Sequence, residues 1–322
     1  MEEKKILIKK NVFILILLII VLLGSTYAWF TVNKNVQIEE IEVKVATSED
    51  LEISVDAINW KHSINSKDLL EGIHTAYPGA INQIPTEELY PTSTAGFITE
   101  GKLDMFYGEA KLNYKTNVYN LTAVKEEEVH GQTGKFIAFD IFLKSGKNTT
   151  IYLNPNSSIY SERSAENTES SGIENATRIA FLKQGLATTS TEAQALKGAT
   201  EAIIVEPNYD VHTAAGIQNA ENVYGITDLN LTDNNSLEYY GIKNDITEGV
   251  LLTDTSDTYF AKVTPNVKVK KSFFNGDEKV ELFQISKGIT KLRVYLWIEG
   301  QDVDCEDKAS GADLNFQLQF IT

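Results

Sequence analysis

Apolar and polar residues alternate with a period of two over much of this chain, which is the pattern of half-buried β-strands. One such set is Leu51, Ile53, Val55 and Ala57. The stretch 136–143 differs, because the residues at both alternating sets of positions are largely apolar. Such a segment is typical of a central strand that is covered on both faces.

Several other stretches have the same character. Strands are predicted at 36–45, 148–157, 177–182, 202–207, 258–264, 273–285, 291–300 and 314–322. The turn sequence "SGKN" suggests a hairpin over 136–155, and Asn275-Gly276 suggests a second one. Helical signals are short and are confined to 66–73 and 190–202.

Many short strands and few helices predict a mainly-β fold, an antiparallel β-sandwich of the jelly-roll-like kind with inserted loops. The irregular insertions are expected near 60–102 and 154–176, because the first contains three prolines and the second is polar and almost free of aliphatic residues.

The chain begins with basic residues and a run of twelve apolar residues from Val12 to Leu23. This layout predicts one N-terminal hydrophobic helix that acts as a secretory signal, with Thr26 and Ala28 as the small residues before the cut. The alternative is an uncut anchor, because residues 12–30 are nearly long enough to cross a bilayer and end in aromatic residues. Residues 1–28 are therefore read as signal peptide or signal anchor, and 29–322 as one extracellular domain.

The net charge limits the kinds of partner that the protein can bind. Removal of residues 1–28 takes away four lysines and two glutamates and leaves 25 basic and 43 acidic side chains, a net charge of −18. A surface of this sign repels nucleic acid, so no nucleic-acid partner is expected. The single cysteine, Cys305, excludes an internal disulfide.

Candidate chemistry is concentrated in the stretch 297–316. Asp302, Asp304, Glu306 and Asp313 fall at positions 1, 3, 5 and 12 of a twelve-residue segment, the spacing at which calcium loops place oxygen ligands. Asp307 stands where such a loop needs glycine, and the flanks are strand-like. Two interpretations stay open: an acidic solvated loop between two strands, or a divalent-ion site of non-EF type with calcium as the ion. The four histidines have no partner at metal-ligand spacing, and no catalytic motif occurs.

The segment "STYAWFTVN" resembles the end of the signal region in the biofilm-fibre proteins TasA and camelysin. In order along the chain, "STYAWF", "FDIFLKS", "IYLNPNSS", "RIAFL" and "RVYLWIEGQDVDC" are similar to exported proteins of Firmicutes-type bacteria. The resemblance implies an extracellular β-rich protein, and it brings no assigned activity and no catalytic residue.

The main functional prediction is therefore an exported, non-enzymatic protein of the cell surface or extracellular matrix that forms fibres with copies of itself. A cut after Ala28 would expose Trp29 and Phe30 at the start of a donor strand that adds to a neighbour's sheet edge. The alternative is a surface module that binds carbohydrate or a host protein through loop aromatics such as Trp60, Tyr77, Tyr90, Tyr107 and Tyr119. Without the cut, residues 12–30 would instead hold the protein in the membrane.

Overall fold

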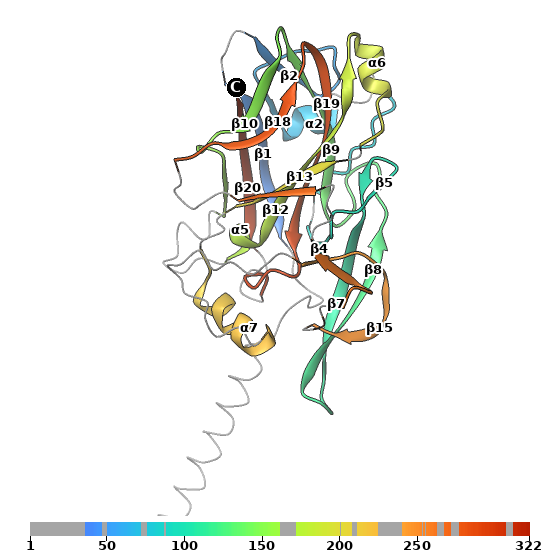
Figure 1. The fold of residues 1–322 in the computed structure, drawn as a ribbon, viewed down its shortest axis with the longest axis vertical. Coiled ribbons are helices and arrows are strands. Elements are labelled where there is room, and N and C mark those ends of the chain that lie inside the picture. Colours follow the sequence, from blue (N-terminus) through green and yellow to red (C-terminus); the bar gives the residue numbers. More distant parts are fainter. Residues whose placement is uncertain are drawn as a thin grey trace, which may run out of the picture.

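The computed structural model shows a mainly-β protein whose strands form two large sheets (Figure 1). It describes residues 36–46, 50–71, 76–86, 88–161, 172–199, 201–207, 211–224, 240–252, 254, 256–262, 267–271, 277–306 and 312–322. The predicted N-terminal helix lies outside these residues.

The smaller sheet has six strands among the described residues. In spatial order they are β18 (Val280–Ile285), β10 (Thr149–Leu153), β20 (Asp313–Ile321), β1 (Gln37–Val45) and β3 (Ser63–Asn65), while β11 (Ser158–Tyr160) also pairs with β20. The strands β1 and β20 are parallel, so both begin at the same end of the sheet.

The larger sheet has ten strands among the described residues. Its path runs β15 (Ile246–Leu251), β8 (Val118–Glu126), β7 (Met105–Asn113), β4 (Pro91–Ser93), β19 (Gly288–Glu299), β12 (Thr177–Ala187), β13 (Ala202–Glu206) and β17 (Val267–Lys271). Along most of β19, the side away from β12 is taken by β9 (Ile137–Ser145), which in turn pairs with β2 (Leu51–Ser54).

The remaining described elements are short. They are the strand pairs β14 (Tyr240–Ile242) with β16 (Phe260–Lys262) and β5 (Ile98–Thr99) with β6 (Lys102–Leu103), and the helices α2 (Ser66–Glu71), α5 (Ile173–Ala176), α6 (Ser190–Ala195) and α7 (Ala214–Tyr224). A capping box starts α6, because the side chains of Thr189 and Glu192 each accept from the other's backbone N–H.

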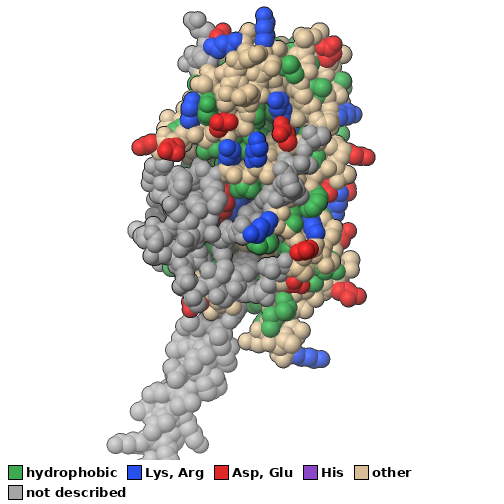
Figure 2. Space-filling view, viewed as in Figure 1, with side chains coloured by type: hydrophobic (Ala, Val, Ile, Leu, Met, Phe, Trp, Pro, Cys, Tyr) green, Lys and Arg blue, Asp and Glu red, His purple; other side chains and the backbone are tan. Residues whose placement is uncertain are grey.

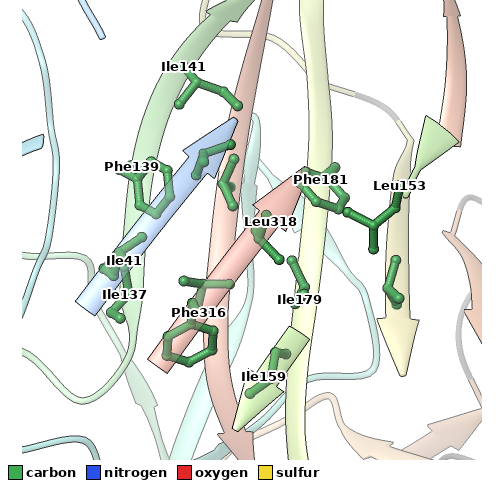
Figure 3. Close-up of a cluster of buried hydrophobic side chains, with 14 of the residues drawn as sticks. Ile41, Ile137, Phe139, Ile141, Leu153, Ile159, Ile179, Phe181, Phe316 and Leu318 are labelled. Carbon is green, nitrogen blue, oxygen red and sulfur yellow. The ribbon is translucent and has the colours of Figure 1, made fainter. Parts of the chain in front are cut away.

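The main core lies between the two sheets, as Figure 3 shows. Ile137, Phe139 and Ile141 of β9 face Ile41 of β1 and Phe316 of β20. The opposite face of β9 is also covered, as its two-sided apolar pattern predicted, because Phe136 and Ala138 join a second apolar cluster with Trp297. The sandwich-like fold therefore has a third layer on the outer face of the larger sheet, formed by α6, β6 and loop segments.

Three parallel pairings correct the prediction of a wholly antiparallel fold. They join β1 with β20, β13 with β17, and β4 with β19. Long connections between the paired strands permit this arrangement, and an alternating pattern records burial rather than strand direction.

The predicted hairpin over 136–155 is also wrong. The strands β9 and β10 belong to different sheets, and Ile141 and Ile151 enter the same core from opposite sides. The turn Asn275-Gly276 of the second predicted hairpin lies outside the described residues; of the strands that flank it, β17 pairs with β13 and β18 pairs with β10. Turn residues signal a change of direction, and they do not distinguish a hairpin from a connection that crosses between sheets.

Candidate functional site

The loop after β19 buries three of the four predicted calcium ligands. Asp302, Asp304 and Glu306 are 8%, 0% and 7% exposed. The loop is folded on itself, because the backbone N–H of Asp304 donates to Asp302 Oδ1 at 2.8 Å and that of Glu306 donates to the carbonyl of Asp304 at 2.9 Å. Residues 302–306 therefore form an ordered, buried turn, and 307–311 lie outside the described residues.

Asp304 is held by four donors from two other parts of the chain. Its Oδ1 accepts from the backbone N–H of Thr213 at 2.9 Å and from the Thr213 hydroxyl at 2.8 Å. Its Oδ2 lies 3.2 Å from Asn175 Nδ2 and 3.2 Å from His212 Nδ1. A Cβ atom at Gly216 would lie 2.0 Å from Asp304 Oδ1, so only glycine lets α7 approach this closely.

Arg178 ties the acidic loop to the larger sheet. Its Nη2 lies between Asp302 Oδ2, at 2.5 Å, and Glu206 Oε1, at 2.9 Å. Its Nη1 donates to the carbonyls of Asn175 and Thr177. All three charged side chains are at most 8% exposed, so the pairing offsets a large cost of burial.

Burial and charge act on the titration of His212 and Asp304 in opposite ways. Burial disfavours the charged imidazole, but the hydrogen bond to Asp304 and the charge of Asp302 outweigh it, so the pKa of His212 is raised. For the Asp304 carboxyl, burial is the larger effect, and it raises the pKa although the hydrogen-bond donors around the carboxylate act to lower it.

His212, Asp302 and Asp304 can each offer one ligand atom within 4.8 Å of the others, which makes them the one metal-type group among the described residues. A calcium ion takes six to eight oxygen ligands and has little affinity for imidazole. Such an ion would have to replace Arg178 and Thr213 as partners of the carboxylates. The prediction of a solvated loop is therefore wrong for Asp302, Asp304 and Glu306, which are buried, and calcium stays a prediction.

The fourth predicted ligand has a different neighbour. Asp313 opens β20, and its Oδ1 accepts from the Ser161 hydroxyl at 3.3 Å. The partners that the structure adds, His212, Asn175 and Arg178, are about 90 to 130 residues away from the loop in sequence. No local spacing rule could have found them, because strand pairing and the docking of α7 bring them together.

A second buried charge cluster lies on the outer face of the larger sheet. Asp140 of β9 accepts from Arg293 Nη1 at 2.8 Å, from the Tyr77 hydroxyl at 2.8 Å and from Lys291 Nζ at 3.1 Å. Lys291 also donates to Tyr77 Oη at 2.8 Å and to the carbonyl of Leu196 at 2.6 Å. Every ammonium proton of Lys291 thus has an acceptor, and the loops that contain Tyr77 and Leu196 are fastened to the sheet.

The same cluster continues through Arg293. Its Nη2 contacts Glu128 Oε2 at 2.6 Å and the carbonyl of Ile81 at 2.7 Å, and the Tyr295 hydroxyl donates to Glu128. Burial alone would raise the pKa of Asp140, but Arg293, Lys291 and the Tyr77 hydroxyl together hold it below its ordinary value. Burial lowers the pKa of Lys291.

The open side of the sandwich offers a different kind of site. The strand β18 pairs on one side with β10, and no described strand pairs with its other side. A seam of about 280 Å³ separates this free edge from β12, β13 and β17. Phe181, Ile203 and Leu282 form its buried apolar part, and Lys183 and Glu281 are among the charged residues that line it.

The predicted processing residues Thr26, Ala28, Trp29 and Phe30 lie outside the described residues, as does all of 12–30. Among the residues that are described, no helix is long and apolar enough to cross a membrane.

The aromatics predicted in loops for ligand binding are partly accounted for by packing, and Tyr107 and Tyr119 lie in strands β7 and β8 instead of loops. Tyr77 is 4% exposed and packs edge-on against Phe142. Trp60 packs on the same apolar cluster, and Tyr119 packs on the cluster around β7 and β8. Lys135 lies over the ring of Tyr107.

Comparisons with protein-family models, with curated proteins and with solved structures find no match to this chain.

Proposed function

We propose that this chain is an exported, non-enzymatic subunit of the cell surface or extracellular matrix, and that its copies assemble head to tail by strand addition. In this proposal the domain is a jelly-roll-like sandwich, and the signal region is cut after Ala28. The segment 29–35 of one copy adds to the free edge of β18 in the next. Export and assembly both rest on the sequence, and the edge of β18 gives assembly a specific acceptor.

The observation that carries the proposal is the distance between β18 and the start of β1. At one end of β20, Asp313 pairs with Gln37 of β1. At the other end, Phe320 pairs with Leu153 of β10, which pairs in turn with Val280 of β18. Seven residue steps along β20 correspond to about 23 Å, and the strands from β1 to the outer side of β18 add about 19 Å sideways. The two points are thus about 30 Å apart.

A tail of residues 29–35 spans at most about 25 Å when fully extended. It is too short to pair along β18 of its own molecule, yet it is long enough to pair with the six residues of β18 in another. A contact of this type joins two different surfaces, so repeating it yields a filament instead of a closed dimer.

The chemistry of the seam suits the tail. Phe30 and Val32 are two residues apart and share one face of an extended strand, which would meet Phe181 and Phe283. Burial of one such aromatic side chain stabilises by about 1.5–3 kcal/mol. Lys183 donates to the carbonyl of Gln284 at 2.9 Å and covers one free acceptor of the edge, so it would move aside on assembly.

Truncation and substitution test the proposal together. Protein starting at Trp29 is expected to polymerise on size exclusion and in negative-stain microscopy. Protein starting at Val36, which keeps every described pairing of β1, is expected to stay monomeric with a similar melting temperature. Truncation near Glu39 tests the same point but removes the first pairs of β1.

The matched substitutions are Phe30→Asp, which should stop assembly, and Thr31→Asp on the opposite face of the tail, which should allow it. Polymers formed by the Val36 protein, or monomers from both proteins at high concentration, would overturn the strand-addition proposal.

A further inference from the structure

We propose that the outer face of the six-stranded sheet binds a neutral glycan chain in a polar groove. The groove holds about 370 Å³ and is lined by residues of β1, β3, β11, β20 and the start of α2. Its volume lies at the lower end of the range for small-molecule sites. The site is distinct from the seam beside β18, so this inference is independent of the assembly proposal.

The floor of the groove is a row of three side chains from adjacent strands. Glu40 of β1 pairs with Asn315 of β20, and Asn315 pairs with Tyr160 of β11. Leu314 and Phe316 point into the core, so Asn315 between them faces outward. Tyr160 is fixed from one side by Gln317, whose Nε2 donates to its hydroxyl at 3.4 Å.

Asn315 carries an unsatisfied donor at this floor. The residue is only 3% exposed, and its Nδ2 has no hydrogen-bond partner within the described part of the chain. A buried amide N–H that lacks an acceptor destabilises the folded state, because its hydrogen bond to water is not replaced. A ligand hydroxyl or carbonyl oxygen in the groove would supply that acceptor, which is the observation that points to a ligand here.

The walls of the groove are held in place by a β-bulge and by hydrogen bonds. A register shift after Ile38 bulges β1 at Glu39, which turns this carboxylate toward the groove rim. The opposite wall is fixed because the Ser66 hydroxyl accepts from the backbone N–H of Ile41 at 2.9 Å. Beside it, Asn65 Oδ1 accepts from the backbone N–H of Asp68 at 3.1 Å and holds the start of α2.

These groups match a polyhydroxylated ligand. An amide both donates and accepts, and carboxylates accept from hydroxyl groups. The ring of Tyr160 gives one apolar surface for a sugar face. No aliphatic side chain is among the described lining residues, so an apolar peptide would gain little there. Two glutamates against the single cation of Lys67 disfavour an anionic chain.

Calorimetric titration of protein starting at Trp29 with cello-, malto-, manno- and chito-oligosaccharides of four to six sugars tests the site. At least one of these neutral chains is expected to bind, and Tyr160→Ala and Asn315→Ala should each weaken that binding at least tenfold. Gln319→Ala, on the same outer face but outside the groove lining, is the matched control and should bind as the wild type does.

Circular dichroism of each variant separates a lost ligand contact from a lost fold, and Tyr160→Ala alone decides the case if Asn315→Ala unfolds. No heat of binding from any of the four series at millimolar concentration would overturn the inference. Binding that Tyr160→Ala leaves unchanged, or preferential binding of oligogalacturonate, would overturn it as well. Both groove variants should still polymerise, so failure here and failure of assembly are separate results.

Discussion

Asp140→Asn is the perturbation that most directly probes how the loops are fastened to the larger sheet. The change keeps the shape of the side chain and removes the charge that faces Arg293 and Lys291. Asp140 is 3% exposed, and removal of one partner from a buried ion pair costs about 3–5 kcal/mol. Arg293 keeps Glu128, so Lys291 bears most of the loss.

For about 290 folded residues the entropy of unfolding is about 0.6 kcal/mol per kelvin, so this cost lowers Tm by about 5–8 °C. Calorimetry at pH 7 on protein starting at Val36 avoids any effect of assembly. The matched control is Asp50→Asn in the exposed pair with Lys147, which should change stability by less than about 1 kcal/mol.

A second variant tests whether the lost stability comes from the Lys291 charge that Asp140→Asn leaves unpaired. Asp140→Asn combined with Lys291→Met removes both charges, and at least half of the lost stability should return because no buried charge is left alone. A fall of less than 2 °C in Asp140→Asn would refute the reasoning, and so would a double variant that is less stable than the single one.

Three further predictions follow from the same contacts and from the signal region. Because the pKa of Asp140 is held below its ordinary value, its stabilising effect is complete above about pH 4; the Tm gap between wild type and Asp140→Asn should be constant from pH 5 to 8 and shrink as the pH falls below 4. The mature chain should begin at Trp29 by mass spectrometry, and Ala28→Tyr should leave the precursor in the membrane; an intact Met1 terminus on the surface protein would support the anchor instead. Tm should be equal in millimolar calcium and in chelator, because protein donors already hold Asp304; a rise that Asp302→Asn with Asp304→Asn abolishes would support the calcium site.

Much of the fold is readable from local pattern. The two-sided apolar stretch 136–143 becomes the central strand β9. The helix predicted at 66–73 corresponds to α2, whose described part is Ser66–Glu71, and the one predicted at 190–202 becomes the shorter α6. These succeed because periodicity reports which faces are buried. The strands β7 and β8 were not predicted; most of their positions are only partly buried, so their alternation is weak.

Pairing and long-range contacts could not be predicted in the same way. The SGKN turn at 145–148 has hairpin composition, yet it carries the chain from one sheet to the other. The candidate site was also only partly predictable. Asp302 and Asp304 stand out in the sequence, whereas their partners Arg178 and His212 lie in segments without any motif. Only the folded chain brings such groups within hydrogen-bond distance.

The central claim is that the N-terminal tail pairs with β18 of another molecule, and a paired-cysteine experiment tests it most directly. Val32→Cys and Phe283→Cys are introduced together into protein starting at Trp29, in a Cys305→Ala background because Cys305 is the only native cysteine. After mild oxidation, a non-reducing gel should show a ladder of dimers, trimers and higher species that collapses on reduction. A monomer with an internal disulfide, or no cross-link in samples that still contain polymers, would contradict the account.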